Sequence, residues 1–349
     1  MDVRADFASV VVPRWAPDIV LSDEVPGSGQ VDMLGYRSPA KFTAPDICFS
    51  EPQPLLTVGG SFMTLAERTG LVPGSTYLTD GRWQEALAAV TTFRTIEEPV
   101  LIAGNPVAGN HYHWLAQCLA AILVADHHGI APGCRLLVPP LGPVQRESLA
   151  AAGIAPERVI ELAPGAAALA ALGIHSNLTT GDFAFFPHPT AVAAFDRIAR
   201  PPAPSRFAGA RVYIARFDAT KRKMVNEEEL SARLEALGFV TLVASALGFA
   251  DQIALFRDAA QIVTQHGAAL ANILFTPGEA VGEAGSGAGP HIVELHQENY
   301  LNQAFLKLGQ VKRLRYTAIV NPREADGPDV HQSRWRADLP LIERVVTAG

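Results

Sequence analysis

The sequence has few cysteines and no long apolar run, and these two absences exclude several classes of protein. Its three cysteines, Cys48, Cys118 and Cys134, lie far apart and form no C-x-x-C pair. A reducing compartment fits them best, with each thiol acting as a small buried hydrophobe rather than as a ligand or nucleophile. The longest apolar stretch, residues 114–125, is shorter than the roughly 20 residues that a membrane-spanning helix needs.

Basic charge is also scarce. The chain has 28 Lys and Arg against 35 Asp and Glu, a formal net charge of −7. No general attraction to nucleic acid or to an anionic membrane follows, so any bound anion must be held locally. Charged residues at positions 2, 4 and 6 interrupt the apolar core that a secretory signal would require. We therefore expect a soluble, cytoplasmic protein.

Apolar residues make up 48% of the 349 positions and charged residues 18%, which excludes a disordered or fibrous chain. A length of about 150 residues per domain predicts two domains. The first hundred residues are typical of short strands and loops. From Pro99 onward, short apolar strands at 100–103, 135–138 and 159–162 alternate with helices at 112–128 and 144–152. This alternation predicts an α/β domain with a mainly parallel sheet.

A proline-rich stretch, residues 200–209, is the best candidate for a linker. After it, a second α/β pattern begins. We expect strands at 212–215, 239–243, 261–264 and 291–295, and helices at 226–237, 249–258, 268–275 and 339–346. In such open sheets ligands bind at the carboxyl ends of the strands, so a cleft between the two halves is the expected site.

The segment around His266 and Gly267 leads from a strand directly into a helix. Free amides at a helix start form an anion site, and glycine lets a ligand approach the backbone closely. A tight strand-to-helix turn without a ligand explains the pattern equally well.

A basic cluster follows the strand 212–215. It contains Arg216, Lys221, Arg222 and Lys223, although the whole chain has only five lysines. Arginine presents a planar fork suited to phosphate. A solvated loop is the alternative, but the position at a strand's carboxyl end favours anion binding. Asn226, just after the cluster, is placed to cap the next helix.

Glu294 lies within an apolar strand, where a buried carboxylate is costly unless it is hydrogen-bonded. It could accept hydrogen bonds from ribose hydroxyls, or it could pair with a neighbouring arginine. In the first half, His111 and His113 stand where a Gly/Asn-rich loop enters a helix, and either could act as a general base. No third residue has the spacing that a metal site with these histidines would need.

The region from Val212 to Asn302 resembles the C-terminal half of glycosyltransferase family 61. The likeness rests on elements in the family's order and spacing: Tyr213-Ile214-Ala215-Arg216, Arg222, Asn226-Glu227, Gly238-Phe239, Gln252-Ile253, His266-Gly267-Ala268 through Asn272, Phe275, Pro277 and Glu294-Leu295. The segment Gly109-Asn110-His111-Tyr112-His113-Trp114 resembles the family's shorter Asn-x-Tyr-His-Trp motif.

The resemblance, to a bacterial member of the family, implies a GT-B-like α/β fold with two Rossmann-like domains facing a central cleft. Residues 1–204 would bind the acceptor and residues 205–330 the nucleotide sugar, with a C-terminal helix in 331–349 packing back on the first domain. The implied reaction is an inverting transfer, from a UDP-sugar in most cases, to a saccharide or other hydroxyl acceptor. No metal or other cofactor is implied beyond the nucleotide sugar as co-substrate.

The resemblance also assigns residues. On the donor side stand Arg216, Arg222, Asn226, His266, Gly267, Ala268, Asn272 and Glu294. On the acceptor side stand Asn110, His111, Trp114 and Gln117, with His113 as the base. The arginines and the His266 turn would neutralise the leaving diphosphate, and Glu294 would hold the ribose.

Two departures from the family pattern stand out. Many relatives carry an acid at the position of Gln117, and a neutral amide orients a histidine less strongly. The segment 279–290 is longer than in relatives and its glycines indicate a surface loop. A nucleotide-sugar-binding partner protein without catalysis, or another transferase on the same two-lobed scaffold, therefore remain alternatives.

Overall fold

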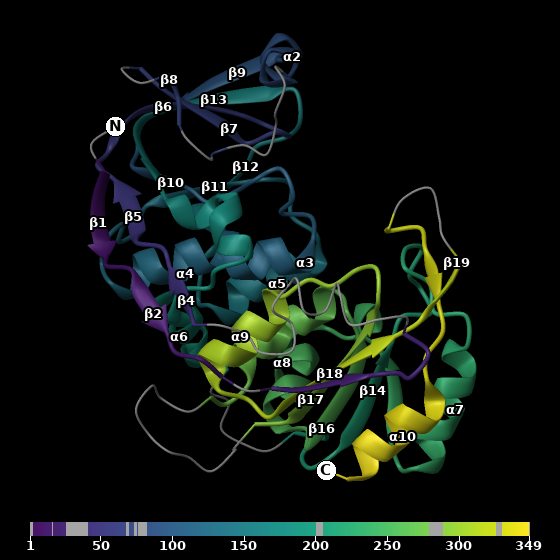
Figure 1. Ribbon diagram of the computed structural model, residues 1–349. Helices are drawn as coiled ribbons and strands as arrows, with labels where there is room; N and C mark the ends of the chain where they lie inside the picture. The colour runs from purple at the N-terminus through teal and green to yellow at the C-terminus, as the bar shows by residue number, and fades with distance from the viewer. Residues whose placement is uncertain are drawn as a thin grey trace. The chain divides into compact units, whose positions relative to one another are not determined.

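The computed structural model describes residues 3–15, 17–25, 41–67, 70–72, 75, 82–199, 205–278, 289–325 and 330–348, and it is a mixed α/β structure (Figure 1). The chain divides into two compact units. Unit 1 consists of Met1–Val12 and Thr43–Ile198, and unit 2 of Pro13–Phe42 and Ala199–Gly349. The boundary near residue 42 falls inside β4 (Phe42–Ala44).

Unit 1 is built on a mixed sheet with the strand order β12-β11-β10-β13-β6-β7-β8, and β9 pairs with β13. Its strands are β6 (Gln53–Val58), β7 (Met63–Ala66), β8 (Gly70–Leu71), β9 (Thr92–Ile96), β10 (Val100–Ile102), β11 (Arg135–Val138), β12 (Val159–Glu161) and β13 (Ala166–His175). The strands from β12 to β13 run parallel, whereas β6, β7 and β8 join antiparallel. The expected α/β class is confirmed, but this sheet is mixed because its antiparallel part comes from the first hundred residues.

The helices of unit 1 include a continuous run that changes its winding twice. The run consists of α3 (His111–His113), a π-helix η1 (Trp114–Leu119) and α4 (Ala120–His127). The remaining elements are β1 (Val3–Phe7), β2 (Val10–Val12), β5 (Ile47–Ser50), α2 (Arg82–Ala88), α5 (Pro143–Ala151), η2 (Pro156–Arg158), η3 (Asn177–Thr179), η4 (Gly181–Ala184), α6 (Pro189–Ala193) and η5 (Ala194–Arg197). The helix predicted at 112–128 is therefore present, with a π segment at its centre.

Unit 2 is built on a parallel sheet with the order β15-β14-β16-β17-β18-β3. Its strands are β3 (Asp18–Leu21), β14 (Arg211–Ala215), β15 (Val240–Val243), β16 (Gln261–Gln265), β17 (His291–Gln297) and β18 (Tyr316–Asn321). After β14 the chain adds β15 on one side of it, and then returns to add β16 on the opposite side of β14. This reversal makes the gap between β14 and β16 a topological switch point, where parallel α/β sheets bind ligands.

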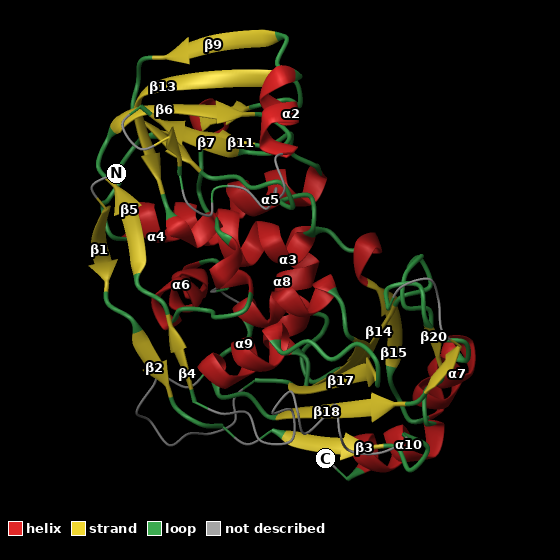
Figure 2. Ribbon diagram, turned by 45° about the horizontal axis from the view of Figure 1, so that its top comes forward, coloured by secondary structure: helices red, strands yellow, loops and turns green. Residues whose placement is uncertain are grey.

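Helices cover both faces of this sheet (Figure 2). One face carries α7 (Glu227–Ala236) and α10 (Leu339–Thr347). The other carries α8 (Phe249–Asp258), the 3₁₀-helix η7 (Ala268–Phe275) and α9 (Ala304–Lys312). A short 3₁₀-helix, η6 (Ala244–Ala246), and the antiparallel pair β19 (Arg323–Ala325) and β20 (Arg334–Trp335) complete the unit.

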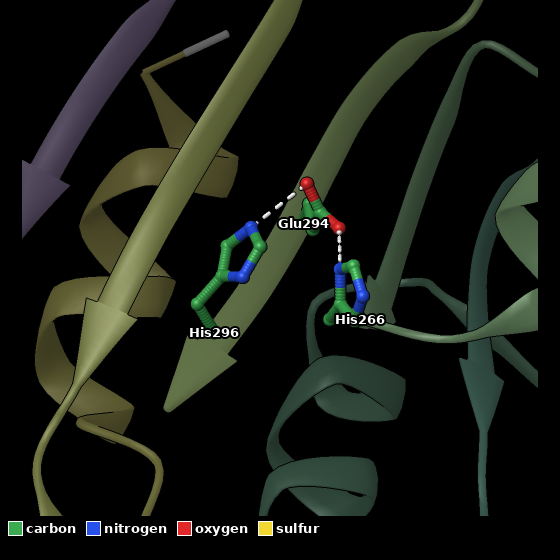
Figure 3. A group of neighbouring side chains, drawn as sticks. All are labelled: His266, Glu294 and His296. Atoms are coloured by element: carbon green, nitrogen blue, oxygen red, sulfur yellow. Dashed lines mark hydrogen bonds and ion pairs between the residues drawn. The ribbon is translucent and has the colours of Figure 1, made fainter. Parts of the chain in front are cut away.

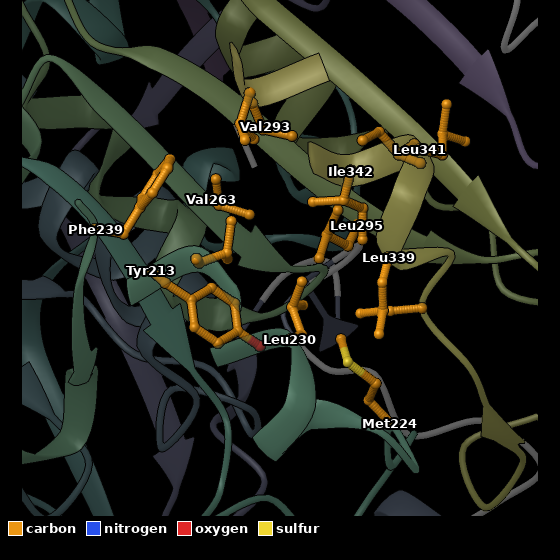
Figure 4. Close-up of a cluster of buried hydrophobic side chains, with 14 of the residues drawn as sticks. Tyr213, Met224, Leu230, Phe239, Val263, Val293, Leu295, Leu339, Leu341 and Ile342 are labelled. Carbon is orange, nitrogen blue, oxygen red and sulfur yellow. The ribbon is translucent and has the colours of Figure 1, made fainter. Parts of the chain in front are cut away.

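The core on the α7 face explains where the C-terminal helix belongs (Figure 4). Leu339, Leu341 and Ile342 of α10 are buried in one cluster with Tyr213 of β14 and Leu230 of α7. The apolar side of α10 thus packs in unit 2, whereas the resemblance led us to expect it against the first half of the chain.

Two predicted segments lie partly outside the described residues. Of the linker 200–209, residues 200–204 are not described, and of the loop 279–290, residues 279–288 are not. Within the described ranges, no helix has the length and apolar character to cross a bilayer.

Candidate functional site

A pocket of about 190 Å³, its open mouth included, lies at the carboxyl ends of the unit 2 strands. It is lined by Arg216, Arg222, Gln265, His266, Leu295, Gln297, Tyr300 and Trp335. Arg216 directly follows β14 and His266 directly follows β16, so the pocket lies at the switch point of the sheet. Three of the residues expected on the donor side are brought together here.

Arg216 is held across the start of η7 by two hydrogen bonds. Its backbone N–H donates to Glu227 Oε1 at 2.6 Å, and its Nη1 donates to the His266 carbonyl at 3.1 Å. Gly267 makes this approach possible, because a Cβ there would lie 3.2 Å from Arg216 Nε. Burial and then the neighbouring charge of Arg222 lower the pKa of Arg216. Two guanidinium groups that repel each other in a partly buried pocket provide a site for an anion.

Arg222 is fixed in an unusual backbone conformation. Its φ of 52° is in the left-handed region, which costs a non-glycine residue about 1 kcal/mol or more. The conformation is kept by two hydrogen bonds: its N–H donates to the His331 carbonyl at 2.8 Å, and its carbonyl accepts from Trp335 Nε1 at 3.0 Å. The guanidinium lies over the Tyr300 ring, 4.5 Å from the centroid. Its direction is therefore set before any ligand arrives.

Three buried polar atoms in the pocket wall have no hydrogen-bond partner among the described residues. They are Arg222 Nε, Gln265 Nε2 and Gln297 Oε1. Gln297 is only 3% exposed, and its Nε2 donates to the Val330 carbonyl at 3.1 Å, so the amide is held in place. An unsatisfied buried polar atom costs about 1–3 kcal/mol, and a ligand with both acceptor and donor groups would recover this cost.

Behind the pocket, Glu294 is the centre of a buried hydrogen-bond cluster (Figure 3). His266 Nδ1 lies 2.6 Å from Oε1, His296 Nε2 lies 2.8 Å from Oε2, and the Tyr316 hydroxyl donates to Oε2 at 2.6 Å. Burial alone would raise the pKa of Glu294. The charge of His296 and the hydrogen bonds from both histidines outweigh burial, so the pKa is lowered and the carboxylate is ionised.

His266 is the link between this cluster and the pocket. Because an ionised carboxylate oxygen only accepts, His266 Nδ1 carries the proton and Nε2 carries the lone pair. Burial lowers the pKa of His266 to about 4, and the bond to Glu294 only partly opposes it. Near neutral pH the imidazole is uncharged, so the positive charge in the pocket comes from Arg216 and Arg222.

The three side chains His266, Glu294 and His296 also form a set that could ligate a metal, since their ligand atoms lie within 4.8 Å of one another. In the present arrangement each histidine nitrogen bonds a carboxylate oxygen directly. An ion bound by this set would replace both hydrogen bonds.

The other residues expected on the donor side have structural contacts. Asn226 exchanges two hydrogen bonds of 2.9 Å with the backbone of Ala337. Asn272 is fully buried and donates to Gln252 Oε1 at 3.0 Å. Ala268 begins η7, and Glu294 is completely buried behind His266 rather than part of the pocket wall.

Sequence reasoning did not assign five residues of the wall to a site: Gln265, Leu295, Gln297, Tyr300 and Trp335. The glutamines end β16 and β17, so their place at strand ends was a readable signal. Tyr300 and Trp335 lie outside the strands of the unit 2 sheet, so the sequence pattern did not indicate that they line the pocket. Lys221 and Lys223 of the basic cluster are exposed.

The residues expected on the acceptor side lie in unit 1. Asn110 caps α3 by accepting from the Tyr112 N–H at 2.9 Å, and His111 and His113 are half-buried on the first turn. Trp114 and Gln117 are fully buried, and Trp114 Nε1 donates to Ser148 Oγ at 2.8 Å. Among these acceptor-side residues, Asn110, His111 and His113 are accessible to solvent.

Comparison with known families covers the acceptor-side residues and all of the donor-side residues except Glu294. A family model described as Glycosyltransferase 61 matches residues 95–282, more than half of the chain. The match includes the histidines of α3, both pocket arginines and the His266 turn. No curated protein matches the chain.

Proposed function

The chain belongs to glycosyltransferase family 61, and on that premise we propose that it transfers a sugar from a nucleoside diphosphate sugar to an acceptor hydroxyl. A UDP-sugar is the proposed donor, and a saccharide or other hydroxyl compound the proposed acceptor. The observation that carries the proposal is the pair of fixed guanidinium groups, Arg216 and Arg222, at the switch point of the unit 2 sheet.

The chemistry of the pocket suits a diphosphate. Arginine donates two parallel hydrogen bonds to phosphate oxygens, and the unpartnered Arg222 Nε supplies a further donor. The charged groups in the described part of the wall are the two guanidinium groups, so we assign to the pocket the phosphate part of the donor.

The proposed reaction is a single displacement with inversion. The acceptor oxygen bonds to the anomeric carbon as the bond from that carbon to the diphosphate oxygen breaks, and the acceptor proton passes to a base, for which His113 is the candidate. Charge develops on the leaving diphosphate, and the two arginines would stabilise it without a metal ion. Glu294 acts in this scheme through His266 rather than on the ribose.

Further parts of the proposal follow the family. We propose a GT-B arrangement, with unit 2 for the donor and unit 1 for the acceptor. A bacterial, cytoplasmic enzyme that builds a surface or exported polysaccharide is the proposed setting.

A donor screen tests the reaction. The protein is incubated with a panel of nucleotide sugars and candidate acceptors, with and without EDTA, and nucleotide release is measured. We expect release with a UDP-sugar that EDTA does not reduce. If nucleotide sugars bind but no nucleotide is released under any condition, the proposed transferase activity is wrong. The protein would then be a nucleotide-sugar-binding partner protein without catalysis.

A substitution tests the site. UDP raises the melting temperature of any fold that binds it, and we expect Arg216→Ala to abolish this rise because half of the pocket's charge is lost. Arg206→Ala is the matched control, since Arg206 pairs with Asp251 on the surface, lies over the Phe207 ring and is not part of the pocket wall. An undiminished rise in Arg216→Ala would refute the donor site.

A further inference from the structure

Gln117 stands in unit 1 at the centre of a buried amide network that reaches His113. Gln117 and Asn105 are 0% and 1% exposed. Asn105 Nδ2 lies 3.0 Å from Gln117 Oε1, and His113 Nδ1 lies 2.8 Å from the same oxygen. The π-helix η1 carries Gln117, so this irregular turn determines where the amide lies.

Two backbone carbonyls fix the direction of both amides. Asn105 Nδ2 donates to the Thr179 carbonyl at 3.1 Å, and Gln117 Nε2 donates to the Thr180 carbonyl. A carbonyl only accepts, so nitrogen, and not oxygen, must face it in each case. Asn105 Oδ1 in turn accepts from the Val107 N–H at 3.1 Å, which agrees with this orientation.

With the amides fixed, the proton on His113 is fixed as well. Gln117 Oε1 can only accept, so His113 Nδ1 must donate to it. A neutral imidazole carries one proton, which places the lone pair on Nε2. Burial lowers the pKa of His113, so the neutral form prevails near pH 7.

We propose that Gln117 and Asn105 are positioning residues that hold His113 as the Nδ1–H tautomer, with its lone pair on Nε2. The catalytic meaning of this tautomer rests on the proposed function, in which His113 is the base. A neutral amide performs this task without a buried charge, and a carboxylate in the same place would face the Thr180 carbonyl. Gln117 thus takes the orienting role that an acid would otherwise have.

The tautomer can be read directly by ¹⁵N NMR of the full chain labelled at histidine, at pH 8. Loss of one signal set in His113→Asn assigns the resonance. We expect a protonated Nδ1 and an unprotonated Nε2 in the wild type. A wild-type His113 with its proton on Nε2 would overturn the proposal. This test uses the wild-type protein, so it does not depend on whether variants of Gln117 fold.

Two substitutions of Gln117 separate positioning from mere packing. Gln117→Leu removes the acceptor, so we expect the Nδ1–H preference to be lost. Gln117→Glu keeps an acceptor and should retain it. A His113 that remains Nδ1–H in Gln117→Leu would also overturn the proposal. Gln53→Leu, on a half-exposed strand position whose side chain makes one long 3.4 Å bond, is the matched control.

Transfer kinetics give the second readout. We expect Gln117→Leu to lower kcat by roughly 10²-fold with the KM for the donor unchanged. We expect Gln117→Glu to restore part of it, because one carboxylate oxygen still accepts from His113 while the other faces the Thr180 carbonyl. A changed KM with unchanged kcat would contradict a positioning role. If neither the wild type nor any variant transfers sugar, the proposed function is wrong. The NMR measurement still determines the tautomer of His113.

Discussion

At the scale of single residues, the pocket depends on a contact between a glycine and an arginine. Gly267 has an extended backbone that any residue can adopt, so its requirement is space rather than conformation. Arg216 fills that space with its Nε, Cζ and Cδ atoms. The direction of the guanidinium therefore depends on the absence of a side chain at position 267.

We expect Gly267→Ala to weaken UDP binding roughly 10-fold to 100-fold, the loss of one charge-assisted hydrogen-bonding group. The added Cβ, 3.2 Å from Arg216 Nε, would push the guanidinium away. Calorimetric titration with UDP measures the change. Gly109→Ala is the control, because a Cβ there meets nothing within 4 Å. Equal affinity in both variants would show that the space at Gly267 does not determine how Arg216 binds the ligand.

The role of Glu294 shows what could be read from single residues. Its burial in a strand and its need for partners were predictable, but the partners were not. Strand alternation places Glu294 and His296 on the same face, which is a signal in the sequence. His266 directly follows β16 and Tyr316 begins β18, and only the sheet order brings them to Glu294.

At the scale of elements, sequence patterns located most strands and helices from residue 100 onward, because short apolar runs there are bounded by glycine and proline. They missed β13, whose alanine-rich sequence is typical of a helix. It is a strand because β10, β6 and β9 all pair with it. The 3₁₀ winding of η7 and the π winding of η1 were also unreadable, since both depend on tertiary contacts.

The C-terminal helix gives a prediction at this scale. Ile342 of α10 is fully buried against α7 and the sheet, so Ile342→Ala should lower the free energy of unfolding by about 2–4 kcal/mol. Urea unfolding measures it. Glu343→Ala, which loses only a half-exposed ion pair with Arg233, should cost less than about 1 kcal/mol. Similar costs for the two would mean that α10 does not pack in the unit 2 core.

At the scale of the whole molecule, three buried histidines link folding to pH. Burial lowers the pKa of His175, His266 and His291 to about 4 each. In the unfolded chain these groups take up protons below about pH 6.5. Between pH 6.5 and 4 the unfolded state therefore binds more protons than the folded state, and stability falls as the pH falls.

We expect each of these histidines to remove about 2 kcal/mol of stability between pH 7.5 and pH 5. Urea unfolding at a series of pH values measures the total. His291→Gln, which keeps a polar group between Gln261 and Thr317, should reduce the slope by close to one proton. A free energy of unfolding that is constant from pH 7.5 to pH 5 would exclude neutral buried histidines.

The edge strand β3 has a consequence for how the protein is made. Residues 18–21 leave the ribosome early, yet their sheet partner β18 lies some 300 residues later, at Thr317–Val320. The Ser22 hydroxyl likewise donates a hydrogen bond to Asp338, which lies 316 residues later in the chain. Strand β3 thus cannot dock on the unit 2 sheet until β18 has been synthesised. A fragment that starts at residue 199 would leave the long buried edge of β18 uncovered and prone to self-association. A chimaeric protein that takes unit 2 from this chain must therefore include strand β3 as well as the residues after 199.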